Sequence, residues 1–474
     1  MTRTGANSAD GAGAPAQDRA RAAVETVIRL EWSRLIAGLA RMAAGDIGIA
    51  EELAQDAVVC ALEQWPADGV PRNPGAWLMT VARRRAIDHF RRNAERERKY
   101  AEIARTLTAP GEEGTADLDR ALADEIDDDL LRLIFTACHP VLSAQARVAL
   151  TLRLLGGLTT AEIARAFLVP EPTIAQRIVR AKRTLNRARV PFETPGAAER
   201  PERLSSVLEV IYLIYNEGYS ATAGADWIRP DLCHEALRLG RVLAELMPGE
   251  PEVLGLAALM EIQSSRLAAR TGPGGEPVLL LDQDRRRWDW LLIDRGLAAL
   301  ARAEQILLGR NPARTEGRSA GDADLTGMDG TGPYVLQAAI AACHARAYRA
   351  EDTDWTRITE LYSVLARVRP SPIVELNRAV ALSMALGPRA GLELVDRLAA
   401  EPSMREYHLL PSVRGDLLRR LGRMAEAQAE FQRASELAGN AAERELSARR
   451  ARAAQAATGS CEPGAVASRG LFSW

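Results

Sequence analysis

Residues 143–189 read SAQARVALTLRLLGGLTTAEIARAFLVPEPTIAQRIVRAKRTLNRAR and are the most informative part of the sequence. Thr159 and Glu162 form the T-x-x-E pattern of a capping box, which opens a helix. We expect that helix to be short, over about 160–167, and to end in a tight turn. Pro172 suits the first turn of the next helix, where the N–H that proline lacks would have no helical partner. The pattern predicts a helix-turn-helix, whose second helix enters the major groove of DNA.

The second of these helices has two distinct faces. Its apolar residues recur at spacings of four, three and four, which predicts a buried face made of Ile174, Ile178, Ala181 and Leu185. Polar side chains that can reach base edges or phosphates occupy the other face: Thr173, Gln176, Arg177 and Arg180, extended by Arg183. A helix face that is merely solvated is the alternative interpretation, which the turn, the cap and the charge together disfavour.

A second basic helix lies upstream. Apolar periodicity predicts helices over 24–43, over 49–65 with Pro66 ending it, and over 75–100. Arginines and two aromatic rings interleave on the third helix: Trp77, Arg83, Arg84, His89, Arg91 and Arg92. The loop before it, 66–74, carries Asp68, Arg72 and Asn73. Such surfaces can stack and hold unpaired bases, whereas a solvated charge run is the usual alternative.

Composition sets outer limits on the class of protein. The 474 residues predict about three domains, and 47% hydrophobic with 26% charged residues excludes a wholly disordered chain. We find no apolar run long enough to span a membrane and no signal-peptide pattern, so we expect a cytoplasmic protein. Three Cys-His pairs occur, at 138–139, 233–234 and 343–344. Adjacent residues on a helix point about 100° apart, so one pair rarely supplies two ligands to one metal, and we interpret the pairs as chance. No catalytic motif is present, so we expect no enzyme, no metal and no cofactor.

Two segments carry a resemblance to a known family. AEELAQDAVVCALEQWP (50–66) followed by NPGAWLMTVARRRAIDHFRR (73–92) resembles region 2 of the extracytoplasmic-function (ECF) sigma factors of the sigma-70 family. The helix-turn-helix resembles their region 4. The resemblance implies binding to core RNA polymerase and to promoter DNA, as duplex at the −35 element and as single strand at the −10 element. One departure is Pro170-Glu171-Pro172, which stands where such a recognition helix usually has a Ser/Thr cap.

The resemblance assigns roles to the residues above. The 49–65 helix would dock on the polymerase through Glu51, Glu52, Gln55, Asp56 and Glu63. The 66–74 loop and the basic helix would melt and capture the −10 element, and the second helix of the helix-turn-helix would read the −35 element.

The resulting organisation is all-α. We expect a disordered leader (1–20), sigma region 2 (21–100), an acidic flexible linker (101–125), sigma region 4 (126–190), a linker (191–202), a helical regulatory domain (203–455) and a tail (456–474).

The long helical tail, with NEGYSA at 216–221 and LLLDQDRRRWD at 279–289, resembles that of a sigma-factor subgroup with a C-terminal extension similar to a tetratricopeptide (TPR) array. Small and aromatic residues recur at the offsets of such a repeat: Gly415, Gly422, Ala427, Phe431 and Ala434, more weakly matched by Ala379, Gly391, Val395 and Leu398. Generic alanine-rich helical hairpins are the alternative. A charged motif at 279–289 is a candidate latch onto the sigma domains, through Asp282, Gln283, Asp284, Arg285 and Trp288, or else a capped helix start.

Two classes of function remain. The first is a sigma factor whose helical domain modulates its activity. The second is a stand-alone helix-turn-helix regulator whose tail senses a ligand or peptide. The second basic helix favours the sigma factor, because a simple repressor has no need of it.

Overall fold

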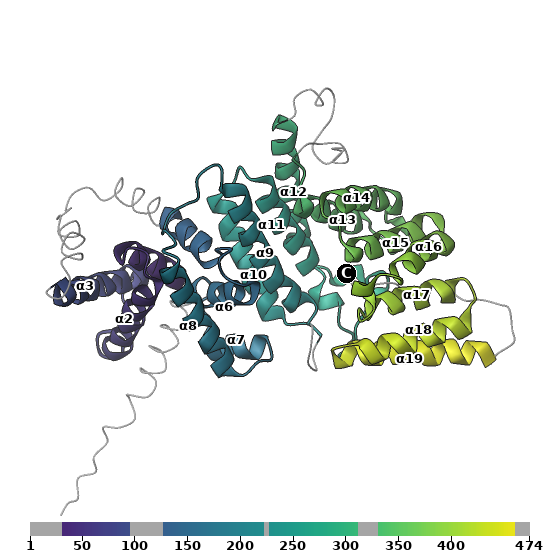
Figure 1. Cartoon of the computed structure of the whole chain (residues 1–474), viewed down its shortest axis with the longest axis horizontal. Helices are drawn as coiled ribbons and strands as arrows, with labels where there is room; N and C mark the ends of the chain where they lie inside the picture. Colours follow the sequence, from purple (N-terminus) through teal and green to yellow (C-terminus); the bar gives the residue numbers. More distant parts are fainter. Residues whose placement is uncertain (1–30, 95–126, 222–226, 311–329, 460–474) are drawn as a thin grey trace, which may run out of the picture. The chain divides into compact units, whose positions relative to one another are not determined.

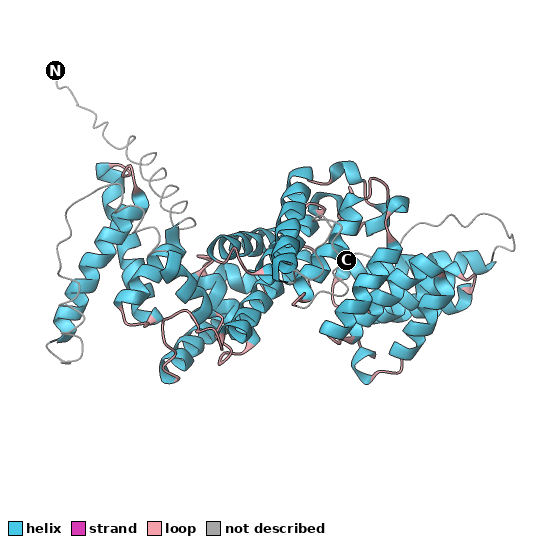
Figure 2. Ribbon diagram, turned by 90° about the horizontal axis from the view of Figure 1, so that it is seen from above, coloured by secondary structure: helices cyan, strands magenta, loops and turns pink. Residues whose placement is uncertain are grey.

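The computed structural model describes residues 31–94, 127–221, 227–310 and 330–459. Every named element in these ranges is a helix, and β-structure among the described residues is confined to isolated bridge positions, such as the pair Thr271 and Pro277. Figure 2 shows this composition by colour. The all-α fold class is thereby confirmed. None of the described helices is both long and apolar enough to cross a membrane.

The chain divides into two compact units, residues 1–211 and 212–474. The boundary lies inside α9 (Arg200–Tyr219), and the last three residues of the linker expected over 191–202 already belong to this helix. The expected leader and the acidic linker lie outside the described residues.

Three helices open the first unit: residues 31–42, α2 (Ile47–Asp68) and α3 (Pro74–Ala94). Asp46 caps α2, because its side chain accepts hydrogen bonds from the N–H groups of Gly48 (2.8 Å) and Ile49 (3.1 Å). The expectation that Pro66 ends this helix was wrong. A proline removes one backbone hydrogen bond but does not oblige the chain to leave the helix, which here continues to Asp68.

The helix-turn-helix is confirmed in its details. The helices of this part are residues 127–137, α6 (Ala144–Leu154), α7 (Thr160–Ala166) and α8 (Glu171–Arg187). Thr159 and Glu162 form the reciprocal capping box of α7. The turn that follows contains Leu168 with a φ of 51°. The buried residues of α8 are Ile174, Ile178, Ala181 and Leu185, the face that periodicity predicted.

The second unit consists of helices that follow one another along the chain (Figure 1). They are α10 (Pro230–Leu246), α11 (Pro251–Ser264), α12 (Trp290–Arg310), α13 (Pro333–Arg346), α14 (Trp355–Val368), α15 (Pro372–Leu386), α16 (Pro388–Leu398), α17 (Leu409–Arg420), α18 (Met424–Leu437) and α19 (Ala441–Gly459). Short 3-10 turns η1 (Leu267–Ala269), η2 (Leu280–Asp282) and η3 (Arg285–Arg287) connect α11 to α12. The last helix runs four residues past the expected end of the domain at 455.

Small residues allow these helices to pack in close pairs, as the repeat pattern predicted. A Cβ added at Gly415 of α17 would lie 2.9 Å from a ring carbon of Phe431 on α18. At Gly391 of α16 it would lie 2.6 Å from the carbonyl oxygen of Ala379 on α15. Phe431 is fully buried, so the glycine leaves the space that its ring fills.

Candidate polymerase and promoter interface

The recognition helix α8 presents its polar residues away from its buried face. Gln176, Arg180 and Arg183 are exposed, and Thr173 and Arg177 are partly exposed. Pro170 precedes the helix without a side-chain capping bond, as its sequence required. The polar face of α8 therefore consists of Thr173 in the first turn, followed by one amide and three arginines.

The basic residues of α3 are also placed on its outer side. Arg83, Arg84 and Arg91 are exposed; Arg92 belongs to α3, but its side chain lies outside the described residues. The helix is amphipathic, because Leu78, Ala82, Ala86 and Phe90 are buried. A positive outer face on a firmly packed helix can follow a nucleic-acid backbone.

The loop and ring residues expected to hold unpaired bases have additional structural roles. Asp68 is the last residue of α2, and Asn73 accepts a hydrogen bond from the N–H of Ala76 at 3.1 Å, so it caps α3. Arg72 between them is exposed. The Trp77 ring meets the buried Trp65 ring edge-on at 5.5 Å, which leaves Trp77 only partly exposed.

His89 is partly exposed on α3, and its ring meets the ring of the buried Phe90 edge-on at 5.5 Å. It lies one turn after Arg85, whose side chain reaches α2. Arg85 therefore anchors the part of α3 around His89 to α2.

Four of the five residues assigned to polymerase docking lie on the exposed side of α2: Glu52, Gln55, Asp56 and Glu63. Asp56 forms an ion pair with Arg85 of α3 at 3.0 Å. The remaining carboxylates give α2 an acidic outer surface, which suits a basic partner surface.

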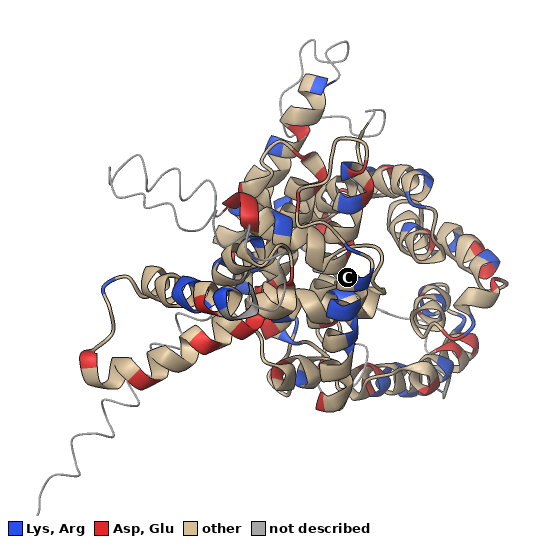
Figure 3. Ribbon diagram, turned by 60° about the vertical axis from the view of Figure 1, so that its left-hand side comes forward, with Lys and Arg blue, Asp and Glu red and all other residues tan. Residues whose placement is uncertain are grey.

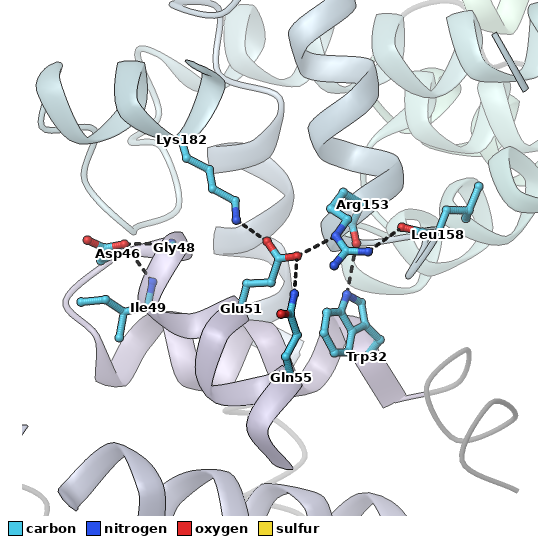
Figure 4. Close-up of polar contacts among 9 residues, drawn as sticks. All are labelled: Trp32, Asp46, Gly48, Ile49, Glu51, Gln55, Arg153, Leu158 and Lys182. Carbon is cyan, nitrogen blue, oxygen red and sulfur yellow. Dashed lines mark hydrogen bonds and ion pairs between the residues drawn. The ribbon is translucent and has the colours of Figure 1, made fainter. Parts of the chain in front are cut away.

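Glu51 differs from these four, because it is 5% exposed. Its carboxylate accepts a hydrogen bond from Nε of Arg153 on α6 at 2.6 Å, one from Nζ of Lys182 on α8, and one from Gln55 at 3.0 Å (Figure 4). The expectation that it shares the solvent-facing side of α2 was wrong. Its spacing from Ile47, Ala54, Ala61 and Trp65 places it on the buried face of the helix.

The partners of Glu51 keep its carboxyl group ionised. Burial raises the pKa of Glu51, but the charges and hydrogen bonds of Lys182 and Arg153 outweigh burial, and the pKa is lowered below its ordinary value. The carboxylate is therefore ionised at neutral pH, and it bridges two cations from the helix-turn-helix part of the chain.

Three further contacts join the same two groups of helices. The indole N–H of Trp32 donates to the carbonyl oxygen of Arg153 at 3.1 Å, and Asn186 of α8 donates to Asp46 at 3.2 Å. Arg41 pairs with the buried Asp129 at 2.8 Å. We call this set of contacts, centred on Glu51, the closure contact.

The sequence interpretation missed the partners in the closure contact. Lys182 and Arg153 lie more than a hundred residues from Glu51 in the chain, and no local pattern links them. The only signal in the sequence was the spacing that places Glu51 on the buried face of α2. A carboxylate buried there needs a cationic side chain from another helix.

The candidate latch residues are placed mainly inside the second unit. Gln283, Arg285 and Trp288 are buried, and Arg285 donates to the carbonyl oxygens of His344 (2.7 Å) and Ala347. Asp282 and Asp284 are exposed, and Asp284 pairs with Arg286 at 3.0 Å. The described partners of this motif are therefore internal to the unit, and among the candidate latch residues only Asp282 and Asp284 are exposed.

The fold and these surfaces define a class of helix-turn-helix DNA-binding protein with a second basic helical domain before the motif. Family models agree with this division of the chain. Residues 30–96 match sigma-70 region 2 and residues 132–185 match sigma-70 region 4. Residues 203–304 match a family of unknown function, DUF6596.

Comparison with known proteins identifies the family. The ECF RNA polymerase sigma factor SigL of Mycobacterium tuberculosis (strain ATCC 25618 / H37Rv) is 30% identical over 30% of this chain and 75% of its own length. SigK of Mycobacterium ulcerans (strain Agy99), also an ECF sigma factor, is 30% identical over 31% of this chain and 76% of its own. The chain belongs to the ECF sigma factors of the sigma-70 family.

The similarity to one protein extends into the second unit. An uncharacterized protein of Rhizobium meliloti (strain 1021) is 45% identical over 84% of this chain and 88% of its own length. No solved structure matches the chain.

Proposed function

We propose that this sigma factor recruits core RNA polymerase through α2, reads the −35 element as duplex with α8, and captures the −10 element as single strand with α3 and the 66–74 loop. The observation that carries the proposal is the two-faced α8. Its apolar face packs against the unit, while Gln176, Arg177 and Arg180 stand on the polar side. A helix built in this way can insert into a major groove without losing its packing.

The role of α3 follows from its exposed arginines and the family match. Backbone phosphates of a melted strand pair with Arg83, Arg84 and Arg91, and the partly exposed Trp77 and His89 offer ring surface to unstacked bases. The acidic outer side of α2, with Glu52, Gln55, Asp56 and Glu63, supplies the polymerase contact.

The closure contact bears on how these surfaces are used. Elements centred on −35 and −10 are about 25 base pairs apart, which is about 85 Å at about 3.4 Å per pair. A folded unit of about 150 residues is only about 40 Å across, from its radius of gyration of about 15 Å. The two DNA-reading surfaces must therefore separate on a promoter, and we propose that release of the closure contact is the opening step.

The second unit is proposed to modulate this activity. Its helical hairpins resemble TPR pairs, which bind peptides or proteins on their concave surface. Of the five candidate latch residues, Asp282 and Asp284 are exposed, and we assign a contact with the sigma domains to these two. The expected setting is the cytoplasm, where polymerase and chromosome meet.

The test is transcription in vitro with sigma-free core polymerase on a pool of genomic promoters. The full chain should yield transcripts that start at discrete sites. A chain that ends at Ile211 keeps the contacts of α9 with region 4, such as Arg203 to the carbonyl oxygen of Phe135 at 2.9 Å. Comparing the two shows whether the second unit inhibits or is required. Tight duplex binding by the chain alone, without any transcript, would instead indicate a stand-alone regulator.

A further inference from the structure

Three arginines are buried together in the second unit. Arg266 and Arg270 follow α11 on either side of η1, and Arg285 begins η3. Their exposed fractions are 4%, 1% and 8%. Buried guanidinium groups normally face a carboxylate, because removing their charge from water is costly.

Arg270 has no such partner. All three of its side-chain nitrogens are buried and lack a hydrogen-bond acceptor in the structure. The groups that act on its charge are Tyr219, Arg266, Tyr215 and Cys233, and among these described neighbours none is a carboxylate. Burial lowers the pKa of Arg270, and the neighbouring positive charge of Arg266 lowers it further. The site therefore holds an uncompensated positive charge.

The rings around Arg270 determine which of its atoms remain available. The guanidinium carbon lies 3.4 Å from the centre of the Tyr219 ring and 4.5 Å from the centre of the Trp227 ring. Rings at this distance cover a planar face of the guanidinium group. The N–H groups point along its plane, so they remain free to form the paired hydrogen bonds that a carboxylate or phosphate accepts.

A second unsatisfied donor lies beside the first. The indole N–H of Trp227, whose ring contacts Arg270, is buried and has no hydrogen-bond partner in the structure. It can only donate, as Arg270 can only donate. Two adjacent buried donors that both lack an acceptor are complementary to a ligand that supplies oxygen atoms and negative charge.

The nearby carboxylates are engaged with other arginines. Glu217 pairs with Arg229 at 2.6 Å, and Glu261 pairs with Arg241 at 2.8 Å. The charges of both signs along the helices can be followed in Figure 3. Neither carboxylate is among the groups that act on the charge of Arg270, so the described residues leave its guanidinium group available to a negatively charged ligand.

We propose that the second unit binds a small oxyanion, a carboxylate or a phosphate group, in the plane of the Arg270 guanidinium and within reach of the Trp227 indole N–H. The family of unknown function that matches residues 203–304 includes both residues. This assigns a ligand chemistry to the unit that is independent of promoter recognition. The carboxylate can belong to a free small molecule or to a peptide.

The experiment is thermal unfolding of the full chain at constant pH and ionic strength, with sodium chloride replaced stepwise by sodium phosphate or by disodium succinate. We expect a saturable rise in Tm for the unit in one of the two anions. At a ligand concentration of about 100 times Kd, the unfolding constant should fall about 100-fold. A C-terminally free acidic peptide, added in a parallel series, distinguishes a peptide carboxylate from a small molecule.

Two variants make the test specific. Arg270→Met should abolish the anion-dependent rise and, in chloride alone, should unfold no earlier than the wild type, because it removes an unpaired buried charge. Arg286→Gln is the matched control. Arg286 is exposed and paired with Asp284, so its variant should keep the full rise.

Three results would overturn the proposal. One is a wild type without a saturable shift in phosphate, succinate or peptide. Another is an equal shift in the wild type and Arg270→Met. The third is loss of the shift in Arg286→Gln. If Arg270→Met does not fold, Arg270→Lys keeps the charge without the forked donors, and an undiminished shift in that variant would also contradict the proposal.

Discussion

Replacing Glu51 by glutamine tests the closure contact directly. The change keeps the size of the side chain and one acceptor oxygen, but it removes the charge that Arg153 and Lys182 share. The carboxylate is 6% exposed, and its two partners are 18% and 20% exposed, so solvent screens the interaction only weakly. A hydrogen bond to a charged group contributes about 1.5–3 kcal/mol, and we expect the closed arrangement to lose about 2–3 kcal/mol. This corresponds to a shift of about 30- to 150-fold in the ratio of closed to open forms.

The assay is energy transfer between a donor and an acceptor dye attached at two exposed positions, Gln64 of α2 and Arg187 of α8. Glu51→Gln should lower the transfer efficiency, and Lys182→Gln should do the same. The double variant should lose less than the sum of the two single changes, because both remove the same interaction. Glu52→Gln is the control, since Glu52 is the exposed neighbour of Glu51. If Glu51→Gln left the efficiency equal to that of Glu52→Gln, the closure contact would not hold the two groups of helices together.

Three further expectations concern other parts of the chain. Arg177→Ala should weaken discrimination at the −35 element by about 1–3 kcal/mol per lost base contact, as measured by transcription from intact and −35-mutated promoters; an equal fall on both would refute the assignment. Gly415→Ala should destabilise the second unit by about 1–3 kcal/mol, because the added methyl group meets the Phe431 ring. Denaturant unfolding measures this, and Gly249→Ala, which meets nothing within 4 Å, should leave the midpoint within experimental error. Burial, with Arg266 and Arg285, lowers the pKa of His344 to about 3. The unfolded chain then binds an extra proton between about pH 6.5 and that value, so the free energy of unfolding should fall by about 1.4 kcal/mol per pH unit as the pH drops through this range; a His344→Gln variant with an unchanged pH slope would contradict this.

Local patterns predicted the helix-turn-helix well because its signals lie within a few residues of one another. The capping box of Thr159 and Glu162 and the buried face of α8 depend on contacts inside one or two turns. The close pairing of Gly415 with Phe431 was also visible, because a repeat fixes both the spacing and the size of the residues.

Long-range contacts could not be predicted in the same way. In the sequence, Glu51 resembles the other acidic residues on the polar face of α2. Its partners Lys182 and Arg153 contact it only in the folded structure. The charged residues around Arg285 suggest a surface motif in the sequence. In the structure, Arg285 is buried and donates to backbone carbonyl oxygens of α13 and of the segment after it. In both cases the sequence shows the charge but not its partner, and the partner decides whether the side chain faces solvent.

We propose that this chain places core RNA polymerase at promoters by reading two DNA elements with α8 and α3. The most direct measurement is transcription in vitro with sigma-free core polymerase and a promoter whose −35 and −10 elements are mutated separately. We predict transcripts from a discrete start site that depend on both elements, with the −35 dependence lost in Arg177→Ala and the −10 dependence reduced in a variant that replaces Arg83 and Arg84 by alanine. Transcription that is absent with the full chain and with the chain ending at Ile211, or that ignores both elements, would contradict the claim.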